Sequence, residues 1–195
     1  MGYYKIKSHA GTGKLLNIAA SGPISGRKNT NIWDESCPID QTWSIASLGN
    51  NQQVKIINNL SYMLNANTST WNCDVYTSNS DTYVNFEKVS TGVYYIRLKS
   101  HPERYLTAGG TKSGSDVSWE KLSTTTAGKK AQQWKVTAVP FFLIIQYRTE
   151  CDLIHLSVSS LHCLPKLVCS VSTHPRCPCT LHSSNADCSC RNSSS

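Results

Sequence analysis

The segments Gln41-Thr42-Trp43-Ser44-Ile45 and Gln132-Gln133-Trp134-Lys135-Val136 decide the fold of this 195-residue chain. Each places a Trp two residues after a Gln and goes on with alternating polar and apolar residues. Such alternation predicts a half-buried β-strand. A weaker copy, Thr82-Tyr83-Val84-Asn85-Phe86, lies between the two, so the chain contains an internal repeat.

Three more strand patterns precede each of these segments. Opening strands are predicted at 4–7, 54–56 and 94–98, second strands at 15–18, 63–66 and 105–108, and third strands at 31–33, 74–76 and 116–118. Gly, Ser, Asn and Thr separate them, which predicts turns and no helical segment. The repeats therefore run over about 3–48, 51–89 and 91–138.

Three four-stranded units cannot close a β-propeller, which needs at least four blades. They can close as one barrel whose end is capped by hairpins, and closure removes free sheet edges. We therefore predict an all-β chain with a β-trefoil of three four-stranded repeats over residues 1–138. Trp43, Trp134, Ile45, Val136 and Phe86 recur at equivalent places, which favours a shared core over a ligand platform. Gln41 and Gln132 can also be structural, satisfying backbone groups.

The two Gln-x-Trp segments, in register with three repeated strand sets, resemble the ricin-type β-trefoil lectins over about residues 3–138. The resemblance implies a non-catalytic carbohydrate-binding module with up to three shallow pockets, one in each unit. In that family an acid on the second strand, polar and aromatic residues on the third, and an Asn-Gln before the Trp contact the sugar.

Carried over, this pattern predicts carbohydrate-binding residues in each unit. The first unit supplies Asn17, Trp33, Glu35, Asp40 and Gln41. The second supplies Asn65, Tyr76, Ser78 and Asp81, with Thr82 in place of the Gln. The third supplies Thr107, Ser118, Glu120 and Gln132, with Ala131 where a polar residue is expected. No unit keeps the acid on its second strand, and Trp33 and Tyr76 lie two residues before the family's aromatic, on the same strand face.

Composition excludes several other classes of function. The net charge of +7 comes from basic residues scattered along the chain, with no run longer than the pairs Arg27-Lys28 and Lys129-Lys130, so we expect no nucleic-acid partner. No run of 18 apolar residues predicts a membrane span, and the start does not resemble a signal peptide, so localisation stays open. The expected partners are glycans: mono- or oligosaccharides, of galactose type or from plant polysaccharides.

Catalytic and metal chemistry are thinly represented. Residues 1–138 contain no Ser/His/Asp set, zinc spacing or phosphate-binding Gly loop, so no enzyme activity, metal or cofactor is expected. Asp34 and Glu35 could be imagined as a glycosidase pair, but neighbouring strand residues point to opposite faces. Cys37 and Cys73 could form a disulfide, although free thiols are favoured.

Seven of the nine Cys lie in residues 139–195, where the repeat pattern stops. This extension could bind a soft metal, could be an oxidised mini-domain, or could be a frameshifted or intron-derived tail, which the abrupt change in composition favours.

Two other functions remain open for the trefoil. It could inhibit a protease through loops at 19–31 or 65–73, or it could be a targeting module cut from a larger enzyme or toxin.

Overall fold

A computed structural model describes residues 1–10, 13–20, 24–36 and 38–140. The chain divides into two compact units, Met1–Ser159 and Ser160–Ser195, and all the described residues belong to the first. The expectations for the Cys-rich extension and for Cys37 lie outside these residues.

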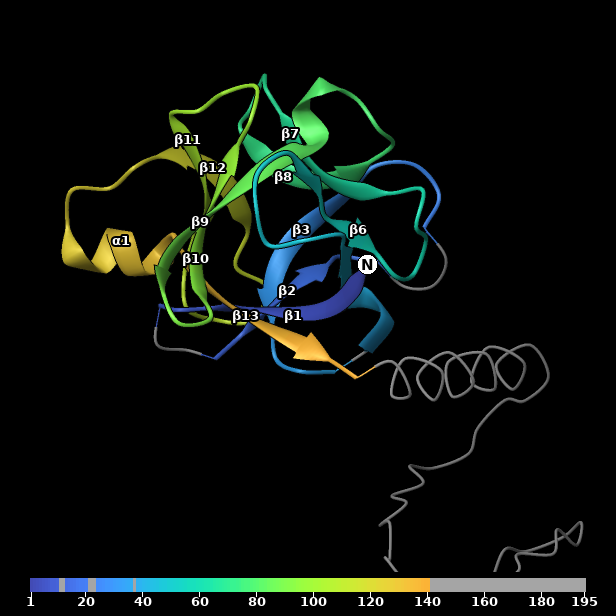
Figure 1. Ribbon diagram of the computed structural model, residues 1–195, viewed down its shortest axis with the longest axis horizontal. Coiled ribbons are helices and arrows are strands. Elements are labelled where there is room, and N and C mark those ends of the chain that lie inside the picture. Colours follow the sequence, from blue (N-terminus) through green and yellow to red (C-terminus); the bar gives the residue numbers. More distant parts are fainter. Residues whose placement is uncertain (11–12, 21–23, 37, 141–195) are drawn as a thin grey trace, which may run out of the picture. The chain divides into compact units, whose positions relative to one another are not determined.

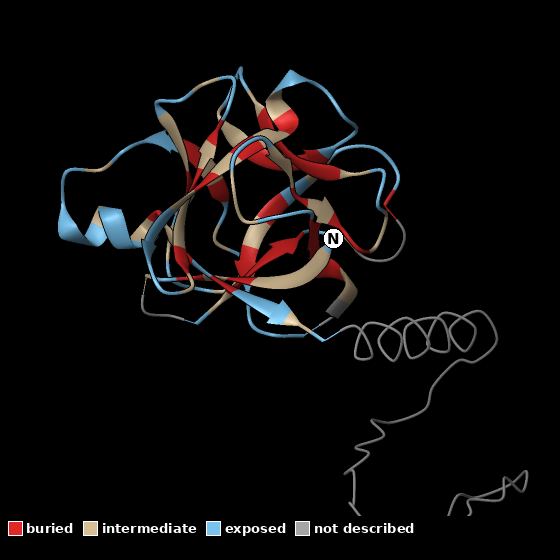
Figure 2. Cartoon of the chain, in the orientation of Figure 1, coloured by how far each residue is buried: buried red, intermediate tan, exposed pale blue. Residues whose placement is uncertain are grey.

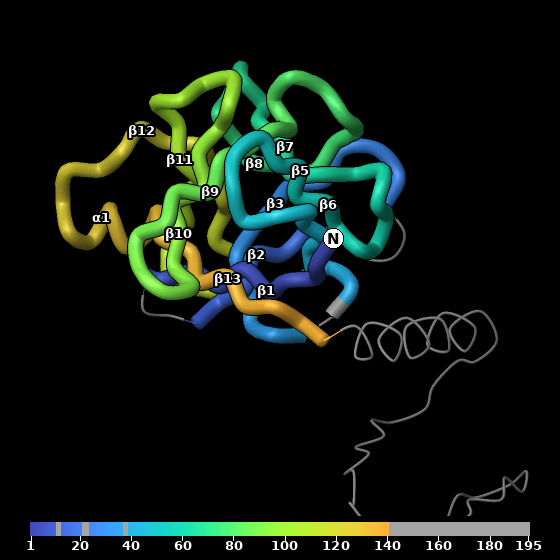
Figure 3. The backbone as a smooth tube through the Cα atoms, in the orientation of Figure 1, coloured from blue at the N-terminus to red at the C-terminus, as the bar shows by residue number. Residues whose placement is uncertain are grey.

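One group of strands closes a barrel (Figure 1). Its members are β1 (Gly2–Ser8), β4 (Trp43–Ile45), β5 (Gln52–Gln53), β6 (Lys55–Ile56), β9 (Tyr83–Ser90), β10 (Val93–Leu98) and β13 (Gln133–Val139). Antiparallel pairing runs from β1 to β4, β4 to β6, β5 to β9, β9 to β10, β10 to β13, and β13 back to β1. Because β5 and β6 flank the single residue Val54, the ring is continuous. Figure 3 shows β1 and β13 running alongside each other where the ring closes.

Three hairpins cap one end of this barrel. They are β2–β3 (Leu15–Ile18 and Lys28–Trp33), β7–β8 (Met63–Asn67 and Asn72–Tyr76) and β11–β12 (Arg104–Ala108 and Val117–Lys121). Their third strands meet one another through the pairs Lys28↔Val75, Ser118↔Asn72 and Asn31↔Asp116. A six-stranded barrel capped by three mutually paired hairpins confirms the predicted β-trefoil.

A helical turn precedes the last strand of each unit: η1 (Pro38–Asp40), η2 (Ser80–Thr82) and α1 (Thr126–Ala131). The expectation of no helical segment is therefore wrong. Thr125 begins α1 as its N-cap, its hydroxyl accepting a hydrogen bond from the Gly128 amide at 3.1 Å. No residue of α1 is buried, and Figure 2 shows the helix as exposed, so its sequence has no apolar periodicity from which to predict it.

The indoles at the Gln-x-Trp positions are fully buried, as predicted. Trp43 Nε1 donates to the Leu16 carbonyl at 3.2 Å, and Trp134 Nε1 donates to the Leu106 carbonyl at 2.8 Å. The second unit has Val84 at this place. There the buried indole of Trp119, from the third unit, donates to the Asn65 carbonyl at 3.1 Å. Asn65 directly follows Leu64, the counterpart of Leu16, so the Trp119 indole binds the neighbouring carbonyl and not the equivalent one.

Strand register fixes which residues of the three hairpins are equivalent. The cross-strand pairs Asn17↔Asn31, Asn65↔Asp74 and Thr107↔Ser118 match one another. Two residues further along the third strand come Trp33, Tyr76 and Glu120. The third strand of the last unit therefore lies further along the chain than predicted, and Glu120, rather than Ser118, is the counterpart of Trp33.

Candidate functional site

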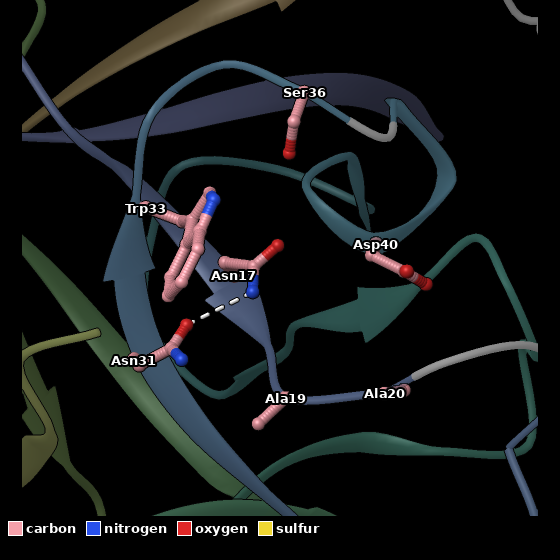
Figure 4. A pocket seen from close by; sticks show the side chains of 7 residues that line it. All are labelled: Asn17, Ala19, Ala20, Asn31, Trp33, Ser36 and Asp40. Atoms are coloured by element: carbon pink, nitrogen blue, oxygen red, sulfur yellow. Dashed lines mark hydrogen bonds between the residues drawn. The ribbon is translucent and has the colours of Figure 1, made fainter. Parts of the chain in front are cut away.

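A pocket of about 430 Å³ lies in the first unit (Figure 4). Strand β2 with the residues after it, strand β3, and the segment around η1 line this pocket with Asn17, Ala19, Ala20, Asn31, Trp33, Ser36 and Asp40. Its volume is within the range of small-molecule sites, about 300–1,000 Å³. Three of the predicted residues, Asn17, Trp33 and Asp40, come together here.

Trp33 is the exposed aromatic of the pocket, with 41% of its surface accessible. The third unit supports its ring, because an ideal Cβ on Gly114 would lie 3.3 Å from Trp33 Cζ3. Gly114 has φ +87, a conformation that favours glycine, and its amide donates to the Ile32 carbonyl at 2.9 Å. The pocket is therefore built by two units.

Two amides lie beside the Trp33 ring (Figure 4). Asn17 Nδ2 donates to Asn31 Oδ1 at 2.9 Å and to the Ile18 carbonyl at 2.8 Å. Within the described residues, these bonds leave the Asn17 oxygen as an acceptor and the Asn31 NH₂ as a donor. The pair therefore offers both kinds of hydrogen-bonding group without a formal charge.

Asp40 forms another wall of the pocket, but its carboxylate is committed elsewhere. Only 6% of Asp40 is exposed, and its Oδ1 accepts from Asn58 Nδ2 at 2.6 Å. In Figure 4 the carboxylate points away from Trp33 and Asn17. Asp40 thus shapes the pocket and holds Asn58, and its carboxylate is not directed at the amide pair.

Gln41 and Glu35 do not line the pocket. Gln41 is buried and clamps the preceding loop, because its Oε1 accepts from the Ser36 amide at 3.0 Å and its Nε2 donates to the Asp34 carbonyl at 2.8 Å. The exposed Glu35 carboxylate pairs with Lys5 at 3.2 Å. The two hydrogen bonds of Gln41 keep Ser36 in place beside the pocket.

Asp34 ties the first unit to the third at the base of this loop. Its carboxylate accepts from Lys14 Nζ and, at 2.7 Å, from the Ser113 hydroxyl, and these bonds hold its pKa below the ordinary value. Ser113 directly precedes Gly114, the residue against the Trp33 ring. The ion pair therefore helps to position the support of the aromatic platform.

In the second unit the same strand positions carry a different arrangement. Asn65 Nδ2 donates to Asp74 Oδ1 at 2.7 Å, and Arg27 Nη1 donates to Asp74 Oδ2 at 3.0 Å. The Arg27 guanidinium also lies over the Tyr76 ring, 4.5 Å from its centroid. Burial raises the pKa of the Asp74 carboxyl above its ordinary value, while the bond from Asn65 and the charge of Arg27 act in the opposite direction.

The other two predicted residues of the second unit, Ser78 and Asp81, form hydrogen bonds with residues outside this cluster. The Ser78 hydroxyl accepts from Gln53 Nε2 at 2.9 Å, and Asp81 Oδ1 accepts from the Ser100 hydroxyl at 2.8 Å. Neither side chain has a hydrogen bond to Asn65 or Asp74 among the described residues. The structure thus brings Asn65 and Tyr76 together through Asp74 and Arg27.

The third unit uses its predicted polar groups within the fold. Gln132 Nε2 donates to Thr107 Oγ1 at 3.1 Å and to the Lys121 carbonyl at 2.8 Å, and Thr107 donates to the Tyr105 carbonyl. Glu120 is exposed. A pocket of about 340 Å³ beside them is lined mostly by small residues: Ala10, Ala108, Gly109, Gly110, Thr111, Ala127, Lys130 and Ala131. This pocket therefore offers few hydrogen-bonding side chains to a polar ligand.

Sequence reasoning missed Asn31, Asp74, Arg27 and Gly114. The first two become visible once the strand register is known, because each faces the Asn of the second strand. Cys73 is a free, buried thiol, and burial raises its pKa. The described residues hold no group of three or more His, Cys, Asp or Glu placed to bind a metal ion, and none of their helices is long and apolar enough to cross a bilayer.

Known proteins share this architecture, although their sequences differ from that of this chain. No protein-family model and no curated protein sequence matches the chain. Among solved structures, the designed three-fold symmetric protein ThreeFoil aligns with a TM-score of 0.60 and 19% identity, over 71% of this chain and 100% of its own. The C-terminal half of an earthworm R-type lectin, solved with GalNAc, aligns with a TM-score of 0.55 and 17% identity, over 71% and 100% of the two chains.

A mosquitocidal holotoxin aligns with a TM-score of 0.62 and 17% identity over 72% of this chain, which spans only 18% of that toxin. At these identities the likeness concerns architecture. Together with the closed barrel, the three paired hairpins and the buried indoles, it shows that this chain has a β-trefoil fold, as the earthworm R-type lectin domain does.

Proposed function

We propose that the chain is a non-catalytic carbohydrate-binding module whose working site is the first-unit pocket. The observation that carries this proposal is the exposed Trp33 ring beside the Asn17–Asn31 amide pair. A pyranose has an apolar face of C–H groups, which packs on an aromatic ring, and a rim of hydroxyls that both donate and accept. The pocket offers a partner for each of these features.

The chemistry of the pocket favours a neutral sugar. The Asn17 oxygen can accept from one ring hydroxyl, and the Asn31 NH₂ can donate to another. Ala19 and Ala20 provide an apolar wall on the other side. Among the described residues that line the pocket there is no Lys or Arg to pair with an acidic sugar. Solved relatives of the same fold include the earthworm lectin domain that was solved with GalNAc, which supports galactose-type sugars as first probes.

The expected affinity for one sugar is low. A monosaccharide of about a dozen heavy atoms, at roughly 0.3 kcal/mol per atom, binds with about −4 kcal/mol, a Kd near 1 mM. The test must therefore detect millimolar binding. We suggest titrating the ¹⁵N-labelled full chain with galactose, N-acetylgalactosamine, glucose and mannose while following its amide resonances, alongside an immobilised glycan panel.

The proposal predicts shifts at amides around Asn17 and Trp33, and their loss in a folded Trp33→Ala variant. Tyr76→Ala is the matched control, because Tyr76 is the equivalent aromatic of the second unit and already carries Arg27. It should leave first-unit binding unchanged. A folded wild-type chain that binds no glycan on the panel would overturn the function, and a Trp33→Ala variant that binds as well as wild type would overturn the site.

A further inference from the structure

The second unit carries a sugar platform that is already occupied by the chain itself. Asn31 and Trp33 both line the first pocket, and strand register makes Asp74 and Tyr76 their equivalents. The guanidinium of Arg27 contacts both of these residues, at 3.0 Å from Asp74 Oδ2 and 4.5 Å from the centre of the Tyr76 ring. It therefore covers the counterparts of two residues that line the first pocket.

Strand pairing shows which residue the first unit has in place of Arg27. The carbonyl of Ser115 accepts from the Ile32 amide, and the carbonyl of Trp71 accepts from the amide of Trp119, the counterpart of Ile32. In the same way Lys28 pairs with Val75. Lys28, Trp71 and Ser115 are thus equivalent, and so are the residues before them, Arg27, Thr70 and Gly114.

Each unit therefore receives one residue at this position from the unit before it. The first unit receives Gly114, which has no side chain to reach over Trp33. The second unit receives Arg27, whose long side chain reaches over Tyr76. At this position the two units therefore differ by a single side chain on the same framework.

A second observation indicates that the filled site is prepared for a ligand. Asn65, the counterpart of Asn17, is completely buried, and its Oδ1 has no hydrogen-bond partner among the described residues. A buried acceptor without a partner is costly. A sugar hydroxyl donating to Asn65 Oδ1 would satisfy it, whereas Arg27 donates to Asp74 and leaves it unpaired.

We propose that the second unit contains a latent site for a neutral sugar, formed by Asn65, Asp74 and Tyr76, and that the Arg27 side chain closes it. This inference rests on the proposed function, since it assigns the same ligand chemistry to the second unit. Arg27 is 41% exposed and is bound by an ion pair and a cation–π contact, so it can move outward into solvent without disturbing the core. Opening the site would raise the number of sugars bound by each chain from one to two.

Removing the Arg27 side chain tests this directly. In a Trp33→Ala background, which silences the first pocket, we expect Arg27→Ala to produce new amide shifts around Asn65 and Tyr76 on titration with the four monosaccharides, with a Kd near 1 mM. With Trp33 intact, Arg27→Ala should also tighten binding to a glycan-coated surface several-fold, because the second site acts at an effective concentration in the millimolar range. Lys28→Ala also removes one positive charge, from the next residue, and should produce neither the new amide shifts nor the tighter surface binding.

A second variant guards against a simple loss of folding. Asp74→Asn keeps the bond to Asn65 but removes the charge that holds Arg27. It should give the same second-unit shifts with smaller amplitude. Both variants are checked for folding by their amide spectra before titration.

The outcomes separate this inference from the proposed function. If wild type binds sugar in the first unit but neither folded variant responds in the second, the latent site is wrong and the proposed function stands. If Arg27→Ala weakens binding in the second unit, Arg27 is a ligand contact and the inference is also wrong. If wild type shows no first-unit binding while Arg27→Ala gains a second-unit response, the first-pocket assignment fails and the latent site stands.

Discussion

Replacing Gly114 with Ala perturbs the first pocket through the Trp33 ring. Gly114 belongs to the third unit, and an added Cβ would lie 3.3 Å from Trp33 Cζ3, closer than ordinary van der Waals contact. The ring must therefore move by a few tenths of an ångström. Because the residue lies outside the pocket lining, any loss of sugar binding reports the position of Trp33 rather than a lost contact with the ligand.

The substitution has two costs, which a matched variant separates. A non-glycine residue at positive φ costs roughly 1–2 kcal/mol of stability. Gly13 has φ +66 with nothing within 4 Å of its added Cβ, so Gly13→Ala should show this backbone cost alone. Gly114, at φ +87, should show the same cost and, in addition, the displacement of Trp33. If stacking on the ring contributes about 0.5–1.5 kcal/mol, Gly114→Ala should raise the Kd about two- to tenfold.

Urea denaturation measures the stability of both variants, and amide titration with the monosaccharides measures their affinity. We expect similar losses of stability, with weakened binding only in Gly114→Ala. A Gly114→Ala variant with wild-type affinity would refute the support of Trp33 by the third unit. Equal weakening in Gly13→Ala would show that general destabilisation, and not the ring contact, is responsible.

Three further predictions concern the fold. Trp43→Ala should lower the free energy of unfolding by about 3–5 kcal/mol in urea denaturation, because it empties a fully buried site and removes the indole donor of the Leu16 carbonyl. Trp33 is half-exposed, so Trp33→Ala should lower the free energy of unfolding far less, and equal losses in the two variants would contradict this prediction. Since burial raises the pKa of Asp74 above 3.8, the folded chain binds more protons than the unfolded chain in the interval above pH 3.8. Wild type should therefore gain stability relative to Asp74→Asn as pH falls through that interval, and a flat difference would count against it. A fragment of residues 1–140 should fold and melt within a few degrees of the full chain, because β13 ends at Val139, whereas an unfolded circular dichroism spectrum would place the boundary elsewhere.

The fold was largely predictable because its determinants are local and repeated. Alternation around Trp43 and Trp134 predicts barrel strands, and both indoles are buried. The third strand of the last unit was misplaced because a shift of two residues keeps every side chain on the same face. Val117 and Trp119 are both buried, so alternation alone cannot choose between Ser118 and Glu120 as the counterpart of Trp33.

The candidate site was predictable only in part. Asn17, Trp33 and Asp40 lie within one unit, so a repeat alignment finds them together. Asn31 and Asp74 depend on which residues face each other across a hairpin, and that pairing was not predicted from the sequence. Gly114 and Arg27 act on a pocket of the following unit, so a comparison of units taken one at a time gives no signal for them.

The three-fold fold and the number of sugar sites are set by different residues. Closure of the barrel depends on buried positions such as Ile6, Trp43 and Trp134, which are hidden from any ligand. In our proposal, the state of each site depends on the residue that the preceding unit supplies, Gly114 at the first and Arg27 at the second. Arg27 is largely outside the core, so its substitution can change the number of sites without dismantling the barrel. In our proposal each site alone binds near 1 mM, so the number of open sites, rather than the affinity of one, would control attachment to a multivalent glycan.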